Sequence, residues 1–274
     1  MQYRYGTTSN QFGFRSNQPL SNDVIARYAP SVLATDAHGS RGEKYSFIPT
    51  IEVLEGLRNE GFQPFEVRQT KTRKEDRREF TKHMVRLRHP DAIGDSAEVP
   101  EIVLINSHDG TSSYQLLAGF FRMVCSNGLI SGNVVNDVRI RHSGDVVGNV
   151  IEGSYRVLEN IAAIEERIDT YKSIQLDAHQ QRAFATAAAQ LRWGETVPLE
   201  LVEDIIMPRR FEDNLPSLWS TFNRAQENLI KGGIRTRTAT GRRSRSHSVG
   251  SVNEDVRLNK ALWTLADELA KAVQ

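Results

Sequence analysis

The sequence predicts an α+β protein, in which an antiparallel β-sheet carrying a basic β-ribbon is followed by a mostly helical C-terminal half. Three patterns support this prediction. Apolar and charged residues alternate at every second position around residues 65–68 and 85–88, which is typical of half-buried strands. Apolar residues recur at helical spacing from Val146 onwards. Basic residues are concentrated between Arg68 and Arg88, within and between the two predicted strands.

The opening segment is polar and rich in Ser, Asn and Gln. Ser21 is placed to cap a short helix that reaches Tyr28, because Pro30 stops a helix soon afterwards. We therefore expect residues 1–44 to form an N-terminal arm with one short helix.

A helix and then a β-ribbon follow. Residues 49–60 carry apolar side chains at helical spacing, and Gly61 is placed to end that helix. The alternating segments 65–68 and 85–88 are joined by the charged connection 69–81. The simplest assembly is a β-ribbon with a cationic tip and a cationic outer face.

The next segments predict further strands and then a long helix. Residues 102–105 are a continuous apolar run suited to a central strand, and residues 106–110 supply turn chemistry. Residues 114–124 are apolar and fit either a further strand or a buried helix, which periodicity does not separate. Residues 146–174 carry one apolar stripe and predict a long amphipathic helix.

The C-terminal part predicts helices and a linker. Asp177 with Gln180 resembles a capping box that opens an alanine-rich helix. Further helices are expected at residues 198–206, 215–231 and 256–273. Residues 232–253 lack an apolar period and are expected to form a flexible basic linker after Gly232 and Gly233 end the preceding helix. The expected domains are the arm 1–44, an α+β nucleic-acid-binding core 45–175, a helical region 176–231, the linker 232–253 and a C-terminal helix 254–274.

Clustered basic residues are the strongest functional signal. Residues 68–88 contain nine basic and three acidic residues, a net charge of +6, and residues 231–245 add six basic residues and no acidic one. The whole chain carries only +1, so the rest of it sums to −11 (1 − 12). Concentrated Lys and Arg favour a polyanion partner, because neutralised phosphates release counterions. The alternatives are a solvated hairpin that discourages edge-to-edge pairing, and a linker that is only a tether. The candidate phosphate-binding residues are Arg68, Lys71, Arg73, Lys74, Arg77, Arg78, Lys82, Arg86, Arg88, Arg242, Arg243 and Arg245.

Aromatic residues beside the first cluster are candidates to stack on unpaired bases, a contact that contributes roughly 1–3 kcal/mol per base. Each of them is also a candidate core residue. They are Tyr45, Phe47, Phe65 and Phe80.

Composition and the absence of known motifs exclude several other classes of protein. The chain has 274 residues, of which 39% are apolar, enough for a sizeable core. Its one cysteine, Cys125, excludes an internal disulfide and leaves no second thiolate for a structural zinc site. No run of eighteen apolar residues and no signal-peptide-like stretch occurs, so we expect a cytoplasmic protein without a membrane segment. No phosphate-binding loop, dinucleotide fingerprint or zinc-protease motif occurs, so we expect no ATP-driven chemistry, cofactor or metal.

Two segments carry reactive side chains. Residues 106–113 gather a hydroxyl, an imidazole and a carboxylate, but triad members normally come from separate segments. A turn that hydrogen-bonds its own backbone or touches phosphate is therefore favoured there. Cys125 needs a nearby histidine to act as a nucleophile, and its apolar neighbours favour a core position instead. Asn127 and Gly128 predict a turn. We expect the protein not to be an enzyme.

Four segments carry a resemblance to a known family: Tyr45–Thr50, Asn106–Ser112, Phe121–Leu129 and Asn228–Gly233. The chain resembles, over nearly its whole length, the phage and plasmid "domain of unknown function" proteins of enterobacterial cryptic prophages and conjugative plasmids. The resemblance implies a mobile-element setting, where DNA arrives single-stranded and must be protected or recombined, and it implies no catalytic residue. The motif residues whose role it leaves open are Asn106, Ser107, His108, Asp109, Gly110, Ser112, Arg122, Cys125 and Asn127.

In element order and charge, the chain also resembles the β-β-β-α core of ATP-independent single-strand annealing proteins of the RecT and Redβ type. That resemblance implies single-stranded DNA as the partner and a homo-oligomeric ring or filament. The stripe at residues 146–174 would then pack within or between subunits.

We therefore expect an ATP-independent single-stranded DNA-binding and annealing protein of a mobile genetic element, which acts in recombination or in the protection of incoming DNA. The alternative is a mobile-element protein that binds and inhibits or redirects a host defence factor, for which the acidic remainder of the chain offers a surface. Hydrolytic or nucleolytic action at His108, Asp109 or Cys125 is the third hypothesis.

Overall fold

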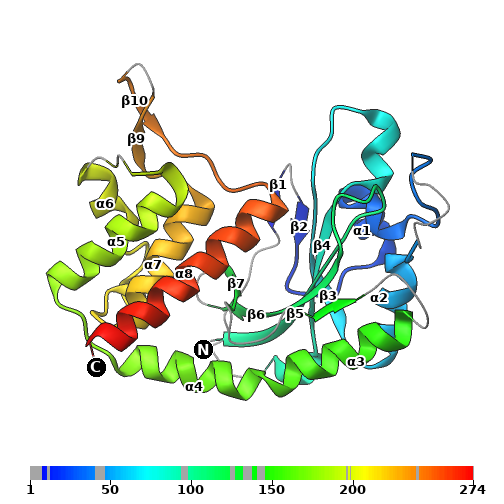
Figure 1. The fold of residues 1–274 in the computed structure, drawn as a ribbon, viewed down its shortest axis with the longest axis horizontal. Helices are drawn as coiled ribbons and strands as arrows, with labels where there is room; N and C mark the ends of the chain where they lie inside the picture. The colour runs from blue at the N-terminus through cyan, green and yellow to red at the C-terminus, as the bar shows by residue number, and fades with distance from the viewer. Residues whose placement is uncertain are drawn as a thin grey trace. The chain divides into compact units, whose positions relative to one another are not determined.

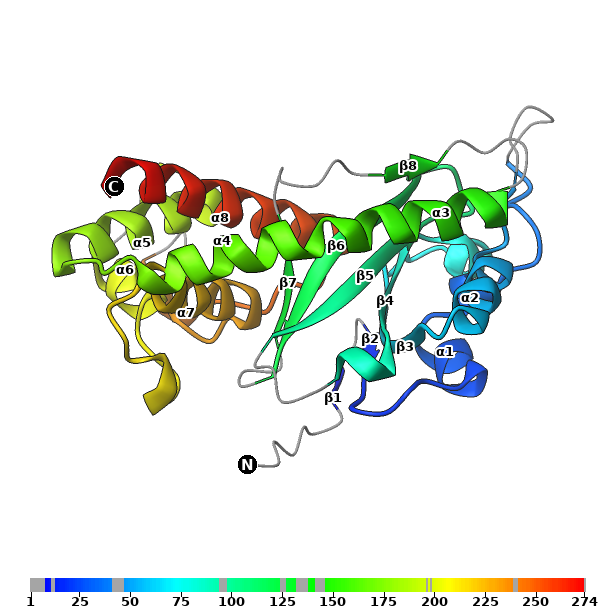
Figure 2. The same ribbon diagram turned by 90° about the horizontal axis from the view of Figure 1, so that it is seen from below.

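The computed structural model describes residues 8–10, 13–40, 47–93, 98–123, 127–131, 138–140, 146–195, 197, 199–238 and 241–273. Contacts divide the chain into two compact units. Unit 1 comprises residues 1–130, 135–161 and 250–252, and unit 2 comprises residues 131–134, 162–249 and 253–274. Unit 1 combines a sheet with helices and unit 2 is largely helical (Figures 1 and 2), so the predicted α+β class is confirmed. No helix in the described part of the chain is both long enough and apolar enough to span a membrane.

Unit 1 is built around an antiparallel sheet, in which the described residues form eight strands. Strands β1 to β7 follow one another in chain order across the sheet, and β8 pairs with β6. The strands are β1 Thr8–Asn10, β2 Gly13–Arg15, β3 Gln63–Gln69, β4 His83–Arg88, β5 Glu98–Asn106, β6 Tyr114–Arg122, β7 Asn127–Ile130 and β8 Val138–Ile140. The segment that fitted either a strand or a helix is therefore strand β6. It adds a long strand that the β-β-β-α order does not contain.

The helices of unit 1 follow the predicted signals closely. They are α1 Asn22–Tyr28, α2 Thr50–Asn59 and α3 Val146–Glu159, with the short 3₁₀ helices η1 Pro30–Leu33, η2 Glu75–Phe80 and η3 Pro90–Ala92. The Ser21 hydroxyl accepts from the backbone N–H of Val24, which is the predicted cap of α1. Helix α3 contacts β5 and β6 and also packs on α2 (Figure 2). Gly56 of α2 permits this contact, because a Cβ there would lie 3.1 Å from Val147 of α3.

The N-terminal segment is part of the sheet and not a separate arm. Strand β2 pairs with β3, with Phe14 opposite Val67 and Arg15 opposite Glu66. The Phe14 ring stacks on Tyr28 of α1, with centroids 4.7 Å apart. The predicted boundary at residue 44 therefore does not separate two parts of unit 1.

Strand β4 shows that both faces of the sheet are covered. His83, Val85 and Leu87 point to the face on which α2 packs, and the intervening residues, Arg86 among them, point to the other face. All six residues of β4 are buried. The prediction of a half-buried strand with a cationic outer face is therefore wrong.

The long predicted helix at residues 146–174 is two helices, α3 and α4 Ile161–Ser173. The break lies at Asn160, whose side-chain amide donates to the carbonyl of Arg156 (2.7 Å). A side-chain donor at this carbonyl competes with the backbone N–H that normally binds it, which weakens and bends a helix at that point. The division between the two units also falls here.

Unit 2 is a group of helices around a buried central helix. Its helices are α4, α5 Ala178–Trp193, α6 Leu199–Ile205, η4 Phe211–Asp213, α7 Leu218–Lys231 and α8 Val252–Val273. Every residue of α7 from Leu218 to Ile230 is buried. Trp219 and Phe222 of α7 pack against Trp263 of α8, with ring centroids 6.4 and 5.7 Å away. The predicted capping box is present, because Asp177 and Gln180 bind each other's backbone N–H at the start of α5.

Candidate nucleic-acid interface

The connection between β3 and β4 carries most of the basic residues of the first cluster. Residues 70–82 hold six basic and three acidic residues, a net charge of +3. They form no long ribbon tip, because η2 folds back within the connection. The side chains that the structure places in solvent are Lys71, Arg73, Lys74 and Arg78, whereas Arg77 and Lys82 are half-buried.

A groove of about 730 Å³ runs beside this connection. Its charged lining residues are the basic Arg27, Lys71 and Arg78 and the acidic Glu75 and Glu79. Tyr28 also lines the groove, and the Arg27 guanidinium lies 5.7 Å from the centre of its ring. We call this feature the connection groove. It combines cations with one aromatic wall, as surfaces that bind single strands do.

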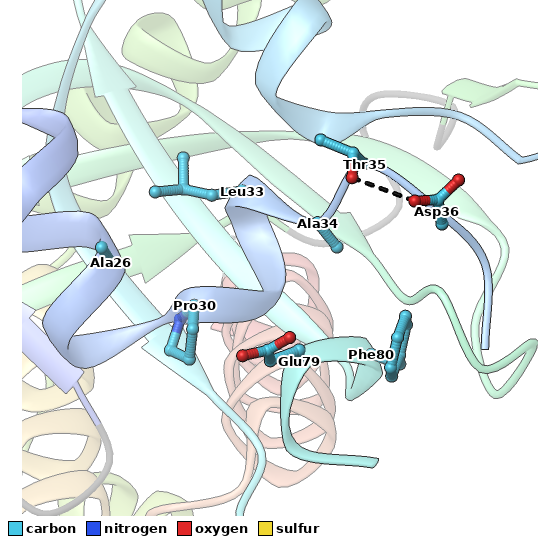
Figure 3. Close-up of a pocket in the computed structure, with 8 residues that line it drawn as sticks. All are labelled: Ala26, Pro30, Leu33, Ala34, Thr35, Asp36, Glu79 and Phe80. Atoms are coloured by element: carbon cyan, nitrogen blue, oxygen red, sulfur yellow. Dashed lines mark hydrogen bonds between the residues drawn. The ribbon is translucent and has the colours of Figure 1, made fainter. Parts of the chain in front are cut away.

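A smaller pocket of about 310 Å³ shares two lining residues, Pro30 and Glu79, with the connection groove. Figure 3 shows its lining, in which Asp36 and Glu79 are the charged residues and Thr35 donates to Asp36 (3.1 Å). The charged lining of this pocket is entirely acidic and repels phosphate, whereas the connection groove has three basic and two acidic residues. The connection groove is therefore the better suited of the two to a polyanion.

Three of the predicted phosphate contacts are bound to carboxylates within the sheet. Arg68 lies 2.6 Å from Glu66, and Arg86 and Arg88 each lie 2.8 Å from Glu101. Arg86 and Arg88 are 0% and 3% exposed. These two arginines have no access to a nucleic acid, so their assignment as phosphate contacts is corrected. The physical reason is that this face of the sheet is covered, and a buried guanidinium needs a carboxylate partner.

The surroundings of Arg86 explain part of the Phe121–Leu129 motif. The guanidinium donates to the carbonyl of Leu129 (3.2 Å) as well as to Glu101. A Cβ on Gly128 would lie 2.6 Å from Arg86 Nη1, and a Cβ on Gly119 would lie 3.4 Å from the same atom. Gly128 therefore lies in β7 to make room for Arg86, which the turn interpretation missed.

The remaining contacts of this network are a carboxylate and aromatic rings. Burial by itself raises the pKa of Glu66, but the charges of Arg15, Arg68 and Arg86 outweigh it and hold the pKa well below its usual range. The Arg88 guanidinium lies 3.7 Å from the ring centre of Phe121. This cation–π contact belongs to a buried network and does not form a binding surface.

Residues 232–253 contain a β-hairpin, which corrects the prediction of a linker without regular structure. Strand β9 Arg235–Arg237 pairs with β10 Arg243–Arg245. Figure 1 shows the hairpin extending from the helices of unit 2. Gly232 and Gly233, both with positive φ, make the turn that leads from α7 into β9. A Cβ on Gly232 would lie 2.5 Å from the carbonyl oxygen of His247, so glycine is required there.

The register of the hairpin places four arginines on one face. Arg235 lies opposite Arg245 and Arg237 lies opposite Arg243, so all four side chains project from the same side. Thr236 and Ser244 occupy the other side and are half-buried. We call these four residues the arginine face.

The hairpin segment itself supplies no acidic residue to the arginine face. No Asp or Glu occurs in the sequence from residue 228 to residue 253. Arg235 forms an ion pair with Asp204 of α6 (2.5 Å), and its hydrogen bonds to this carboxyl lower the pKa of Asp204. Arg245 donates to the carbonyl of Gly233 (2.6 Å). Like charges directly opposite each other destabilise a strand pair, so contact with an anion on this side would stabilise the hairpin.

The motif at residues 106–113 forms a turn that hydrogen-bonds its own backbone. Asp109 accepts from the backbone N–H and the hydroxyl of Thr111 (3.0 and 2.6 Å). The Ser107 hydroxyl accepts from the backbone N–H of Ser112 (2.8 Å), and Gly110 has a positive φ of 74°. Asp109 therefore forms hydrogen bonds within the turn, as expected for a segment that hydrogen-bonds its own backbone.

A buried polar cluster joins this turn to α2 and η1. Thr50 Oγ1 lies 2.9 Å from His83 Nε2, 3.4 Å from His108 Nε2 and 3.0 Å from the donor amide of Asn106. The other ring nitrogen of His83 lies 2.9 Å from the Ser31 hydroxyl. All five residues are 0% exposed. Burial lowers the pKa of His83 well below its ordinary value, and the neighbouring His108 lowers it further.

This cluster gives catalysis at His108 little support. Both histidines have hydroxyl groups as hydrogen-bond partners, and Asp109 forms hydrogen bonds within the turn instead. Complete burial also closes the cluster to a substrate. Among the described residues no group of three or more His, Cys, Asp or Glu side chains is arranged to hold a metal ion.

The other predicted residues are placed as follows. Phe65 is buried, Phe47 lies beside His108 (ring centroids 4.7 Å apart), and Phe80 lies beside His38 (5.2 Å). None of these three rings is an exposed platform. Arg122 is buried near Glu98 (3.9 Å). Tyr45 and Cys125 lie outside the described residues, and Asn127 is described only as the first residue of β7.

Sequence reasoning missed two aromatic residues, Tyr28 of the connection groove and Phe211. Phe211 in η4 is 89% exposed. The sequence signal for Phe211 is its position directly after Pro208, Arg209 and Arg210, between two predicted helices.

Comparisons with known proteins identify a family and two similar proteins. Residues 37–263 match the family described as "Domain of unknown function (DUF932)". The "UPF0380 protein YafZ" and the "UPF0380 protein YfjQ", both of Escherichia coli (strain K12), are 48% and 47% identical to it over 260 residues, which is 95% of each chain. No solved structure matches the chain, and the comparisons give no support to the resemblance to single-strand annealing proteins.

Proposed function

The chain belongs to the DUF932 family, and we propose that it binds nucleic acid through the phosphate backbone, with single strands as the preferred ligand. The observation that carries this proposal is the arginine face of the β9–β10 hairpin. Four guanidinium groups share one side of two short strands, and two like-charged pairs lie directly opposite each other. A phosphate chain along this side would offset the repulsion between the like-charged pairs.

The connection groove of unit 1 supports the same ligand. Three basic side chains and Tyr28 line it, and Arg73 and Lys74 are exposed on the adjoining connection. Each surface is complete within its own unit. The proposal therefore needs no site between the two units.

Salt-dependent binding to labelled oligonucleotides tests the proposal. The variant Arg237→Gln/Arg243→Gln removes one opposed pair of the arginine face. If each arginine neutralises one phosphate of a single strand, the slope of log affinity against log salt becomes shallower by about 1.4, at roughly 0.7 per contact. The variant relieves like-charge repulsion but also removes the hydrogen bond from Arg237 to the carbonyl of Gly241 (3.3 Å), so an unchanged thermal unfolding transition is the check that the hairpin stays folded.

A matched control removes two positive charges elsewhere in unit 2. Arg257 and Lys271 lie on α8 and form exposed ion pairs with Glu254 and Glu268. The variant Arg257→Gln/Lys271→Gln is expected to keep the wild-type slope. Equal slopes for all three proteins, or binding that does not depend on salt, would refute the proposal.

We extend the proposal to ATP-independent annealing of complementary strands. A protein that neutralises phosphates weakens the repulsion between two strands and needs no nucleotide to do so. Mixing two complementary labelled strands with the protein in the absence of ATP is expected to speed duplex formation. Binding without faster annealing would keep the binding proposal and remove the annealing one. A homo-oligomeric ring or filament stays a prediction, which mass measurement with and without an oligonucleotide tests.

A further inference from the structure

We infer that Phe211 is a stacking platform for one unpaired base of the strand that the arginine face holds. This inference rests on the proposed nucleic-acid binding and narrows it to single strands with accessible bases. Phe211 is 89% exposed, although burial of a phenylalanine side chain is normally favourable. Met207 and Leu215 of the same connection are also exposed (56% and 59%), and exposed apolar residues are common in proteins, so the inference depends on how the ring of Phe211 is held.

Buried ion pairs hold the turn that presents the ring. The Arg210 guanidinium contacts Asp213 at 2.6 Å and Glu227 of α7 at 2.7 Å. The side chains of Asp213 and Glu227 are 1% and 2% exposed. Lys231 also contacts Glu227 (2.8 Å). Three-way pairing of this kind fixes a turn strongly, so the outward position of Phe211 is built into the fold and is not the result of a loose loop.

The same turn is attached to the base of the hairpin. Arg209 donates to the Asn228 side chain (2.6 Å) and to the carbonyl of Gly232 (2.5 Å). The next carbonyl, that of Gly233, accepts from Arg245 of the arginine face. Phe211 is thus two residues after Arg209, whose side chain binds the base of the hairpin. All of these residues belong to unit 2.

The chemistry of the surroundings selects the ligand. A protein partner of the exposed ring would have to present carboxylates to the arginine face as well. A single strand presents phosphates and flat apolar bases along one chain, and aromatic rings beside cationic grooves stack such bases regardless of their identity. Glu212, exposed beside the ring, opposes phosphate locally, which favours contact of the ring with a base over contact with the backbone.

The test compares two strands of equal length, oligothymidylate and an abasic deoxyribose-phosphate strand. The change Phe211→Ala is expected to weaken binding of oligothymidylate by about 5- to 150-fold, equivalent to ~1–3 kcal/mol for one stacked base. Binding of the abasic strand is expected to stay as in the wild type. Phe211→Trp is expected to keep both affinities, and Leu215→Ala, which removes an exposed aliphatic side chain from the same connection, serves as the control.

The outcomes separate this inference from the proposed function. If the wild type binds neither strand, the proposed function fails. If the wild type binds both strands and Phe211→Ala weakens both equally or neither, only the stacking inference fails, and the exposed ring is then left for a protein partner. Because the ring is in solvent, thermal unfolding of Phe211→Ala is expected to match the wild type, which excludes misfolding as the cause of a loss.

Discussion

Replacement of Glu101 by glutamine tests the buried charge network of the sheet. Glu101 is 1% exposed and accepts hydrogen bonds from Arg86 and Arg88, both at 2.8 Å. Glutamine has nearly the same shape but no charge. Glu101→Gln therefore leaves two buried guanidinium groups without their shared counter-charge.

The structure sets the expected magnitude. Breaking a buried ion pair by removing one partner costs about 3–5 kcal/mol, because the other charge stays buried without compensation. Two arginines lose the same partner here, and Glu66 lies 3.8 Å from only one of them, Arg86. We expect the free energy of unfolding to fall by an amount near the upper end of that range.

Urea unfolding followed by circular dichroism measures this change. All three tryptophans, Trp193, Trp219 and Trp263, belong to unit 2, so their fluorescence reports on that unit separately. Glu101→Gln is expected to shift the circular dichroism transition to lower urea and to shift the fluorescence transition less.

The control is Glu268→Gln, which breaks an exposed ion pair with Lys271 on α8. It is expected to cost much less than Glu101→Gln, because exposed pairs are screened by solvent. If Glu101→Gln costs no more than this control, the assignment of Arg86 and Arg88 to a structural network is wrong, and their role as phosphate contacts becomes open again.

Three further predictions concern stability. Burial lowers the pKa of His83 in the folded protein below its ordinary value of 6.5. Below pH 6.5 the unfolded chain therefore binds this proton and the folded protein does not. The free energy of unfolding keeps its full value above that pH and falls by about 1.4 kcal/mol per pH unit below it. His83→Gln is expected to make this acid dependence shallower in urea unfolding at several pH values, and an unchanged slope would contradict the assignment. Gly232→Ala is expected to cost about 1 kcal/mol or more in thermal unfolding, since φ is +68° and the added Cβ meets the His247 carbonyl; a neutral effect would mean that the hairpin entry is not constrained. Asp177→Ala removes the capping box with Gln180 and is expected to cost about 1 kcal/mol by the same measurement, unless water replaces the cap at no cost.

Local sequence signals predicted the local structure well. The Ser21 cap, the Asp177 capping box and the end of α7 at Gly232 are all present. Alternation at every second position predicted β3 and β4. These features need partners only two to four residues away, so a short window of sequence contains all the groups involved.

The candidate site was only partly predictable. The exposed basic residues of the β3–β4 connection were found from charge alone. Arg243 and Arg245 of the arginine face were also among the predicted contacts, but the face itself was not predicted, because whether Arg237 and Arg243 share a side depends on the hairpin register. That hairpin is held by Gly232 and by Asp204, which lies 31 residues before its partner Arg235.

Local patterns in the sequence therefore indicate the order and type of most elements, and the positions at which many of them begin and end. Which faces of these elements are covered depends on contacts between residues that are far apart in the chain. Periodicity groups Arg86 with Arg88 on one face of β4, but their burial depends on Glu101 and on the space left by Gly128, 42 residues away from Arg86 in the chain. A charged residue that the local pattern assigns to a binding surface lies in the core when distant residues supply its counter-charge and exclude water. No short segment of sequence contains that information.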